Sequence, residues 1–267
     1  MQSFPKLSVI TVVYNASDRI RETIDSVLMQ DYDDIEYIIK DGGSTDGTLD
    51  IIKEYAGRND NIIILSERDE GIYDAMNASV AMATGDVIEF LNAGDRFVSE
   101  NTVSKAIHVM LDTDSDVVYG DVLYVFPDGS EKVRAYPQSC SQKVYFLTGD
   151  AINHQVMFAS KKLFEGNLFD TSYRICADRE WMLRAGVYAG RCKMKALGMI
   201  VAAYPLDGTS VINSALYKQE AGRCIRRHMP IGYPVYAVFE FFRSHAGLSA
   251  FLHKIYEKLY CKETPVR

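Results

Sequence analysis

One carboxylate in the first half of the sequence is well placed to bind a metal ion. Asp95 lies near the end of the stretch Thr84–Phe97, in which a turn is followed by a short apolar strand and then by a tight polar turn. A carboxylate just past a buried strand lies at the rim of the sheet, where open α/β folds bind their ligands. A hard divalent cation takes one or two such carboxylates and completes its coordination with water and phosphate oxygens. The alternative is a turn, Asn92–Asp95, that only reverses the chain.

The second half of the sequence holds further polar side chains in apolar surroundings. His154 and Gln155 interrupt the apolar stretch Ala151–Phe158, which we predict to be a strand. A histidine there could bind a phosphate or a substrate or ligate a metal, and the alternative is a core histidine whose ring nitrogens are satisfied locally. Asp178 precedes a stretch with helical spacing whose apolar face holds Trp181. Taken by itself, this Asp is the N-cap of that helix, a position that Asp fills well.

Alternating strands and helices in the first hundred residues must position these groups. The apolar runs predict four strands, Leu7–Val13, Ile35–Ile39, Ile62–Leu65 and Val87–Leu91, with helical periodicity in between. This order predicts an α/β fold with a mostly parallel, Rossmann-like sheet and right-handed crossovers. The polar loops that follow the strands, at residues 11–15, 41–44, 67–74 and 92–95, should therefore converge at one rim as a binding site.

Composition and charge narrow the class of protein. The chain has 267 residues, of which 48% are hydrophobic and 24% charged, and its net charge of -7 argues against bulk binding to nucleic acid. Five cysteines without a Cys-x-x-Cys pair indicate neither a disulfide framework nor a zinc site, and are typical of reduced thiols in the cytoplasm. We find neither a signal peptide nor an apolar run of the length that spans a membrane.

The last part of the sequence differs in character from the rest. Residues 213–267 carry nine lysines and arginines against four glutamates. An aromatic and apolar stretch, Tyr233–Phe242, is followed by an amphipathic pattern from Leu248 to Leu259 with lysines on its polar face. A basic amphipathic helix with aromatic residues is typical of a segment that lies on an anionic bilayer. The alternative is packing against the rest of the chain or against a second subunit, as in a homodimer.

Four motifs in order resemble the family-2 glycosyltransferases, especially the bacterial members that build cell-surface polysaccharides. They are Ser-Val-Ile-Thr-Val-Val-Tyr-Asn at 8–15, Asp-Gly-Gly-Ser-Thr-Asp-Gly-Thr at 41–48, Gly-Ile-Tyr-Asp-Ala-Met-Asn at 71–77 and Gly-Asp-Val-Ile-Glu-Phe-Leu-Asn-Ala-Gly-Asp at 85–95. The resemblance covers residues 7 to about 205. It implies the GT-A fold, with a catalytic domain at 1–210, divided into a nucleotide-binding half (1–110) and an acceptor half (111–210). A helical extension at 211–267 would follow.

The resemblance also implies roles for individual residues of the first half. The expected donor-binding residues are Thr11, Tyr14, Asn15, Asp41, Gly43, Asp74 and Asn77. Among them, Asp41 matches the acidic residue that recognises the base. Asp95 matches the last Asp of the Asp-x-Asp-type motif that holds Mg or Mn against the donor diphosphate. The sequence departs from the family pattern at Asn92, where the first Asp is usual, and at Gly42 and Gly94, which also replace acidic residues.

In the second half, the resemblance makes Asp178 the general base of an inverting transfer, with Glu180 as the reserve candidate. Ala177 replaces the acidic residue that often precedes the base. We expect His154, Gln155 and Trp181 to bind the acceptor, Trp181 as a platform for a sugar ring, although an aromatic residue at this position could equally belong to the core.

The expected function is thus the transfer of a sugar from a nucleoside diphosphate donor, in the first instance a UDP-sugar, to a hydroxyl of a surface glycan or lipid-linked oligosaccharide. We expect the enzyme at the cytoplasmic face of the inner membrane. A nucleotidyltransferase is one rival, but its Gly-rich loop with Lys or Arg is missing after the first strand, at residues 14–17. The non-enzymatic rival is a degenerate scaffold that only binds nucleotide in an assembly complex.

Overall fold

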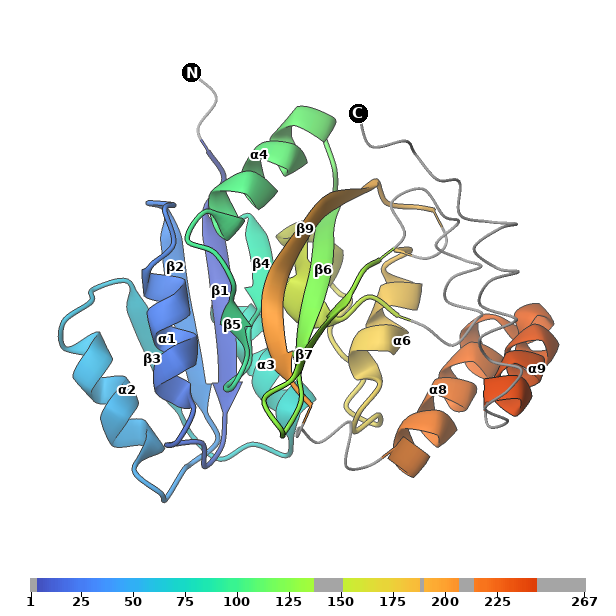
Figure 1. Cartoon of the computed structure of the whole chain (residues 1–267), viewed down its shortest axis with the longest axis horizontal. Helices are drawn as coiled ribbons and strands as arrows, with labels where there is room; N and C mark the ends of the chain where they lie inside the picture. Colours follow the sequence, from blue (N-terminus) through green and yellow to red (C-terminus); the bar gives the residue numbers. More distant parts are fainter. Residues whose placement is uncertain (1–3, 137–150, 188–189, 207–213, 244–267) are drawn as a thin grey trace.

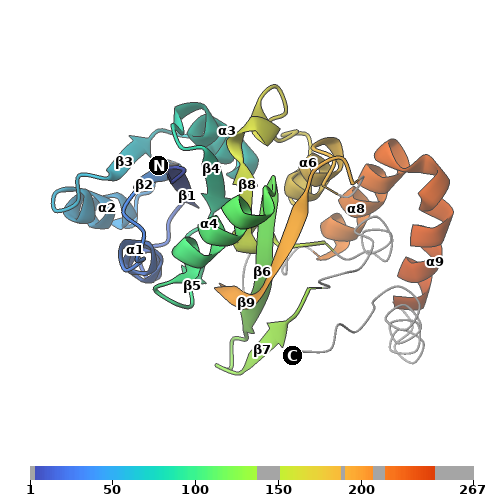
Figure 2. The ribbon, with the colours of Figure 1, turned by 90° about the horizontal axis from the view of Figure 1, so that it is seen from above.

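The protein is a layered α/β structure built on one nine-stranded sheet (Figure 1). The computed structural model describes residues 4–136, 151–187, 190–206 and 214–243. The strand order is β3-β2-β1-β4-β8-β6-β9-β5, with β7 paired to β6. Helices α1, α2 and α4 cover one face of the sheet, and α3 and α6 cover the other (Figure 2). The predicted fold class is confirmed.

The first half of the chain forms the parallel part of the sheet. Its elements are β1 (Leu7–Val13), α1 (Ile20–Leu28), β2 (Ile35–Asp41), α2 (Thr48–Ala56), β3 (Ile62–Ser66), α3 (Ile72–Met82) and β4 (Val87–Phe90). Strand β1 pairs in parallel with both β2 and β4, and β2 pairs in parallel with β3. Every residue of β1 is buried, as its run of β-branched and apolar side chains predicts for a central strand covered on both faces.

The second half continues the sheet with mixed pairing. Its elements are β5 (Arg96–Phe97), α4 (Thr102–Thr113), β6 (Val117–Val125), β7 (Glu131–Arg134), the 3₁₀ turns η1 (His154–Val156) and η2 (Lys161–Phe164), β8 (Met157–Ser160), α6 (Ala177–Arg184) and β9 (Met194–Pro205). Strand β8 runs antiparallel to β4 and β6. The stretch Ala151–Phe158 is therefore not one strand, because a 3₁₀ turn at His154 comes before the strand begins at Met157.

The C-terminal elements are α8 (Ser214–His228), the 3₁₀ turn η3 (Pro230–Gly232) and α9 (Tyr233–Arg243). Helix α8 packs beside α6, with α9 next to it (Figures 1 and 2). Cys224 and Ile225 of α8 belong to the same buried core as the strands of the sheet. No helix within the described ranges is long and apolar enough to cross a membrane. The amphipathic pattern predicted from Leu248 to Leu259 lies outside the described residues.

Candidate active site

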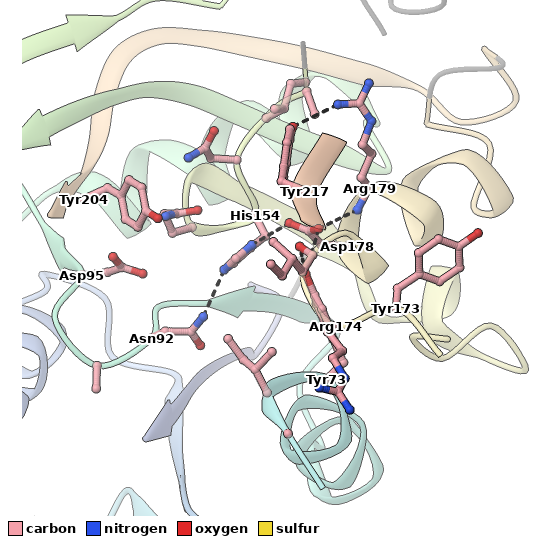
Figure 3. A pocket seen from close by; sticks show the side chains of 18 of the residues that line it. Tyr73, Asn92, Asp95, His154, Tyr173, Arg174, Asp178, Arg179, Tyr204 and Tyr217 are labelled. Atoms are coloured by element: carbon pink, nitrogen blue, oxygen red, sulfur yellow. Dashed lines mark hydrogen bonds and ion pairs between the residues drawn. The ribbon is translucent and has the colours of Figure 1, made fainter. Parts of the chain in front are cut away.

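A cavity of about 1000 Å³ opens at the carboxyl ends of the parallel strands (Figure 3). The loop before α3, the turn after β4, the 3₁₀ turn at His154 and the start of α6 supply its polar walls. Tyr204 of β9 and Tyr217 of α8 add aromatic surface to the lining. Two of the four polar loops expected at the rim, those at 67–74 and 92–95, therefore reach this cavity, together with residues from the second half of the chain.

Asp178 lies in the first turn of α6, two residues after Cys176, which is the N-cap, so the prediction that Asp178 is the N-cap is wrong. Its carboxylate accepts hydrogen bonds from the His154 ring, with Nδ1 2.9 Å from Oδ2, and from the Arg179 backbone N–H. The Tyr73 hydroxyl lies 3.0 Å from Oδ1 and 2.6 Å from the Ile175 carbonyl oxygen, so its hydrogen is shared between them.

The surroundings of Asp178 keep it ionised. Burial alone would raise the pKa of this carboxyl. The hydrogen bond and the positive charge that His154 supplies, with the bonds from Arg179 and Tyr73, outweigh burial and hold the pKa of Asp178 below its ordinary value. A carboxylate that is ionised at neutral pH and faces a cavity can accept a proton from a bound hydroxyl group.

His154 joins Asp178 to the turn that carries Asp95 (Figure 3). Its Nε2 lies 3.1 Å from the Asn92 side-chain nitrogen, on the side of the ring opposite Asp178. Burial lowers the pKa of His154, but the hydrogen bond to Asp178 and the charges of Asp178 and Asp95 raise it above the ordinary value. When the ring is protonated, both of its nitrogens donate. In the orientation described, the Asn92 side-chain oxygen is buried without a partner within the described ranges. Turning the amide over would let this oxygen accept a hydrogen bond from Nε2.

Asp95 is a buried carboxyl on the cavity wall. Burial raises its pKa to about 7, while the charge of His154 acts in the opposite direction. Glu89, at the centre of β4, is completely buried, and neither of its carboxylate oxygens has a hydrogen-bond partner among the described residues. Burial, followed by the charge of Asp95, raises the pKa of Glu89 well above its ordinary value. No group of three or more His, Cys, Asp or Glu side chains in the described part of the chain could hold a metal by itself.

The expected donor residues divide into exposed and buried ones. Asp74 lines the cavity and accepts a hydrogen bond from the Glu70 N–H. Tyr14 is 64% exposed just past β1, and the Asn15 side chain accepts a hydrogen bond from the Thr45 N–H. These side chains remain available to a ligand, although Tyr14 and Asn15 lie outside the cavity lining.

The side chains of Thr11 and Asp41 are buried and are not exposed to a ligand. The Thr11 hydroxyl is buried and donates to the Leu91 carbonyl oxygen, so its expected place in the lining of the nucleotide pocket is wrong. The Asp41 carboxylate is also buried. It accepts hydrogen bonds from the N–H groups of Gly43 and Ser44 and from the Ser66 hydroxyl. It therefore shapes the loop in which Gly43 adopts a left-handed φ of +83°.

Two of the expected ligand-binding residues have structural contacts instead. Trp181 is 1% exposed and stacks on Phe164 with 4.3 Å between ring centroids, so it belongs to the core and the platform for a sugar is wrong. The Asn77 amide donates to the Phe169 carbonyl oxygen and accepts from the Phe169 N–H. It ties α3 to the segment before α6 and does not line the cavity.

Of the residues that we expect to bind the acceptor, His154 and Gln155 line the cavity. Sequence reasoning missed Tyr73, Glu89, Tyr204 and Tyr217. A charged residue at the centre of an apolar strand was a visible signal for Glu89. The other three carry no local signal, because tyrosine is common in buried strands and helices.

The sequence matches a protein-family model and is similar to several known proteins. The model of the family described as Glycosyl transferase family 2 matches residues 8–173. A PGL/p-HBAD biosynthesis glycosyltransferase of Mycobacterium bovis is 33% identical over 184 residues, which cover 67% of this chain and 69% of that protein. An uncharacterized glycosyltransferase of Mycobacterium tuberculosis is 33% identical over 195 residues, covering 70% of this chain and 71% of that protein.

Solved structures share the fold at low sequence identity. S. aureus TarS residues 1–349, in complex with UDP-GlcNAc, superposes with a TM-score of 0.65 at 18% identity, covering 91% of this chain and 73% of that one. The mannosyltransferase PcManGT of Pyrobaculum calidifontis, in complex with GDP-Man and Mn²⁺, gives a TM-score of 0.64 at 16% identity, covering 97% and 81%.

Proposed function

Because the chain belongs to glycosyl transferase family 2, we propose that it is an inverting enzyme acting on a nucleoside diphosphate sugar. The sugar would pass to a hydroxyl group of a cell-surface glycan or of a lipid-linked oligosaccharide. The single observation that carries this proposal is the Asp178 carboxylate, which faces the cavity and is kept ionised by His154.

In this mechanism, Asp178 accepts the proton of the acceptor hydroxyl while the hydroxyl oxygen attacks the anomeric carbon. The new carbon–oxygen bond forms as the bond to the diphosphate breaks, and the leaving diphosphate takes the electron pair. His154 compensates the charge of Asp178 before the transfer and keeps its Oδ2 oriented. A general base of this kind contributes about 10²- to 10⁴-fold to the rate.

We assign the divalent cation, Mg or Mn, to Asp95. This buried carboxyl faces the cavity without a lysine or arginine partner in the described part of the chain, and burial has raised its pKa, so a cation would stabilise the ionised form. One carboxylate suffices for a cation whose remaining ligands are phosphate oxygens and water. The cation would neutralise charge on the diphosphate leaving group.

The choice of donor and acceptor draws on the similar proteins. TarS has been solved with UDP and UDP-GlcNAc and PcManGT with GDP-Man, and we propose a UDP-sugar as the donor of this chain. The relative from Mycobacterium bovis is named for PGL/p-HBAD biosynthesis, which supports a lipid-linked or glycan acceptor. Thr11, Gly43 and Asp41 would support the donor loops from behind, whereas Tyr14, Asn15 and Asp74 would contact the donor.

We further propose that the enzyme works at the cytoplasmic face of the membrane, with α9 as a peripheral contact. Ile231 before the helix and Val235, Val238 and Phe241 on it are exposed apolar side chains. Arg226 on α8 supplies an exposed positive charge nearby. Such a surface suits an anionic bilayer. A homodimer through the same helix is the alternative, and binding to anionic vesicles separates the two.

The decisive test is isothermal calorimetry with UDP and with GDP, with and without Mn²⁺, on the wild type and Asp95→Ala. We expect Mn²⁺-dependent binding of UDP that Asp95→Ala abolishes. Donor turnover of Asp178→Asn then separates an enzyme from a scaffold, because the variant should bind the nucleotide and lose transfer. If no nucleotide binds to the wild type, the donor site is wrong. If the wild type binds nucleotide but neither hydrolyses nor transfers the donor, the scaffold is right.

A further inference from the structure

Helix α8 holds the segment that leads into α6, where Asp178 is located. The Glu220 side chain, on α8, is buried, and its carboxylate accepts hydrogen bonds from three consecutive backbone N–H groups. The donors are Arg174 at 2.8 Å, Ile175 at 2.9 Å and Cys176 at 3.0 Å. These amides precede the first turn of α6 and have no partner within that helix.

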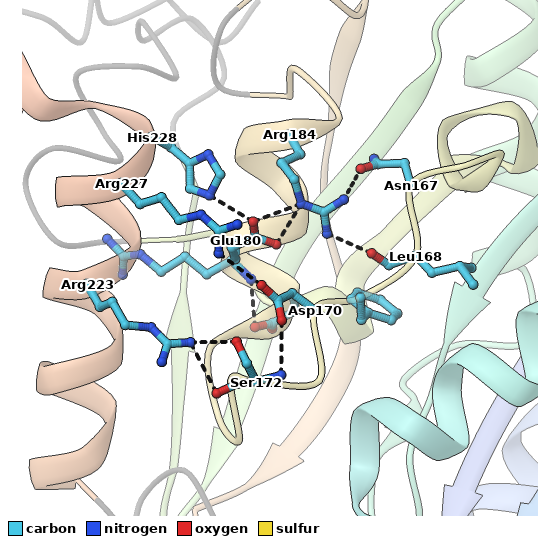
Figure 4. A network of polar contacts seen from close by, with 12 residues as sticks. Asn167, Leu168, Asp170, Ser172, Glu180, Arg184, Arg223, Arg227 and His228 are labelled. Atoms are coloured by element: carbon cyan, nitrogen blue, oxygen red, sulfur yellow. Dashed lines mark hydrogen bonds and ion pairs between the residues drawn. The ribbon is translucent and has the colours of Figure 1, made fainter.

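Other residues of α8 hold the same segment (Figure 4). Arg223 donates to the Ser172 hydroxyl and lies over the Tyr173 ring, 3.7 Å from its centroid. Arg227 pairs with Asp170 at 3.1 Å. These contacts are at the surface and contribute little individually. Glu220 is different, because its side chain is buried and its removal would take a charged acceptor from three backbone amides at once.

Two further residues of α6, Glu180 and Arg179, also contact α8. Glu180, one turn after Cys176, is buried between Arg184, with Nε 2.8 Å from its carboxylate, and His228 at 2.8 Å (Figure 4). Tyr217 of α8 accepts a hydrogen bond from the Arg179 guanidinium at 3.0 Å. Glu180, which sequence reasoning kept as a reserve base, is thus committed to this network.

The contacts of Glu220 continue directly to Asp178. Ile175 donates its N–H to Glu220, while its carbonyl oxygen lies 2.6 Å from the Tyr73 hydroxyl. The same hydroxyl lies 3.0 Å from the Asp178 carboxylate. The peptide groups around Ile175 are therefore held from α8 on one side and from α3 on the other, three residues before Asp178.

We propose that Glu220 is a positioning residue for the transfer reaction. By fixing residues 174–176 it sets the position of Asp178 relative to His154 and Tyr73. Helix α8 would therefore contribute to the geometry of the active site. This inference rests on the proposed role of Asp178 as the base.

The test compares Glu220→Gln and Glu220→Asp with Gln219→Ala, a neighbouring exposed position on α8. In Glu220→Gln the charge is lost and an amide nitrogen faces N–H donors. We expect hydrogen exchange at the amides of residues 174–176 to rise at least about tenfold, since hydrogen bonds to a charged acceptor are lost. The emission of Trp181, the single tryptophan of the chain, should shift because it lies on α6.

In turnover assays, Glu220→Gln should lower kcat about tenfold or more and leave the affinity for UDP unchanged, with partial recovery in Glu220→Asp. Gln219→Ala should match the wild type in every measurement. Unchanged exchange at residues 174–176 in Glu220→Gln would overturn the inference, as would faster exchange with an unchanged kcat. A loss of UDP affinity together with the loss of kcat would also overturn it, because Glu220 would then stabilise the structure in general and not the position of Asp178. Failure of Asp178 as the base would instead appear as full activity of Asp178→Asn, whatever Glu220→Gln does.

Discussion

Removal of His154 should shift the pH dependence of turnover in a defined direction. In the wild type, the hydrogen bond and charge of His154 hold the pKa of Asp178 below its ordinary value against the effect of burial. In His154→Ala both are lost while burial persists, so the pKa of Asp178 rises. A base must be ionised to act, and the acidic limb of the kcat profile should therefore move to higher pH.

The size of the shift follows from the contact itself. A hydrogen bond to a charged group contributes about 1.5–3 kcal/mol, and one pKa unit corresponds to about 1.36 kcal/mol. The acidic limb should move up by about one to two pH units. In His154→Asn, an amide can still donate to Asp178 without the charge, and the shift should be smaller. Tyr73→Phe removes a neutral donor that Asp178 shares with Ile175, and should shift the limb least.

The assay measures kcat from about pH 3 to pH 9 at saturating donor and Mn²⁺, because a pKa below the ordinary Asp value of about 3.9 places the wild-type acidic limb below pH 5. Under these conditions kcat reports the groups of the enzyme–substrate complex, and binding effects at Asp95 are suppressed. An acidic limb that stays in place in His154→Ala would refute the reasoning, because it would mean that the titrating base is not the carboxyl beside His154. Retention of full turnover by Asp178→Asn would refute it more directly.

Three further predictions concern stability, each measured by denaturant unfolding. Glu89→Leu should raise the free energy of unfolding by about 1–3 kcal/mol at pH 8, since a buried carboxyl without a described partner is removed. The raised pKa keeps Glu89 protonated in the folded state, whereas the unfolded state loses this proton as pH rises above about 4.3, so the contribution of Glu89 to wild-type stability falls over that range. The gain in unfolding free energy from Glu89→Leu should therefore shrink towards pH 4, and an equal gain at pH 4 and pH 8 would contradict this. Trp181→Ala should cost about 3–5 kcal/mol through a cavity against Phe164, and a cost below 1 kcal/mol would show that the ring is not packed as described. Lys40→Met should cost about 3–5 kcal/mol, because the buried Lys40 amine pairs with Asp69 and its loss leaves that carboxylate uncompensated; an unchanged midpoint would argue against the pair.

The sequence by itself determined the layered fold and the turn that carries Asp95. Alternating apolar runs and helical spacing are local signals, and a parallel sheet covered on both faces is the arrangement that buries them. The turns that contain Gly43 and Asp95 could also be predicted from the sequence, since glycine and short polar residues are typical of the turns that follow strands. The rank of Asp178 above Glu180 as the base came from the resemblance to the family.

Only the tertiary structure decided which of these side chains meet. Asn92, His154 and Asp178 come from three separate elements, and no periodicity in the sequence indicates that one imidazole bridges the other two. Burial of Thr11 and Trp181 likewise depends on what packs over them. Glu220 is an ordinary residue of an amphipathic helix until α8 folds back onto the start of α6. Local patterns fix the type of each element, whereas contacts between distant residues depend on how all elements pack together.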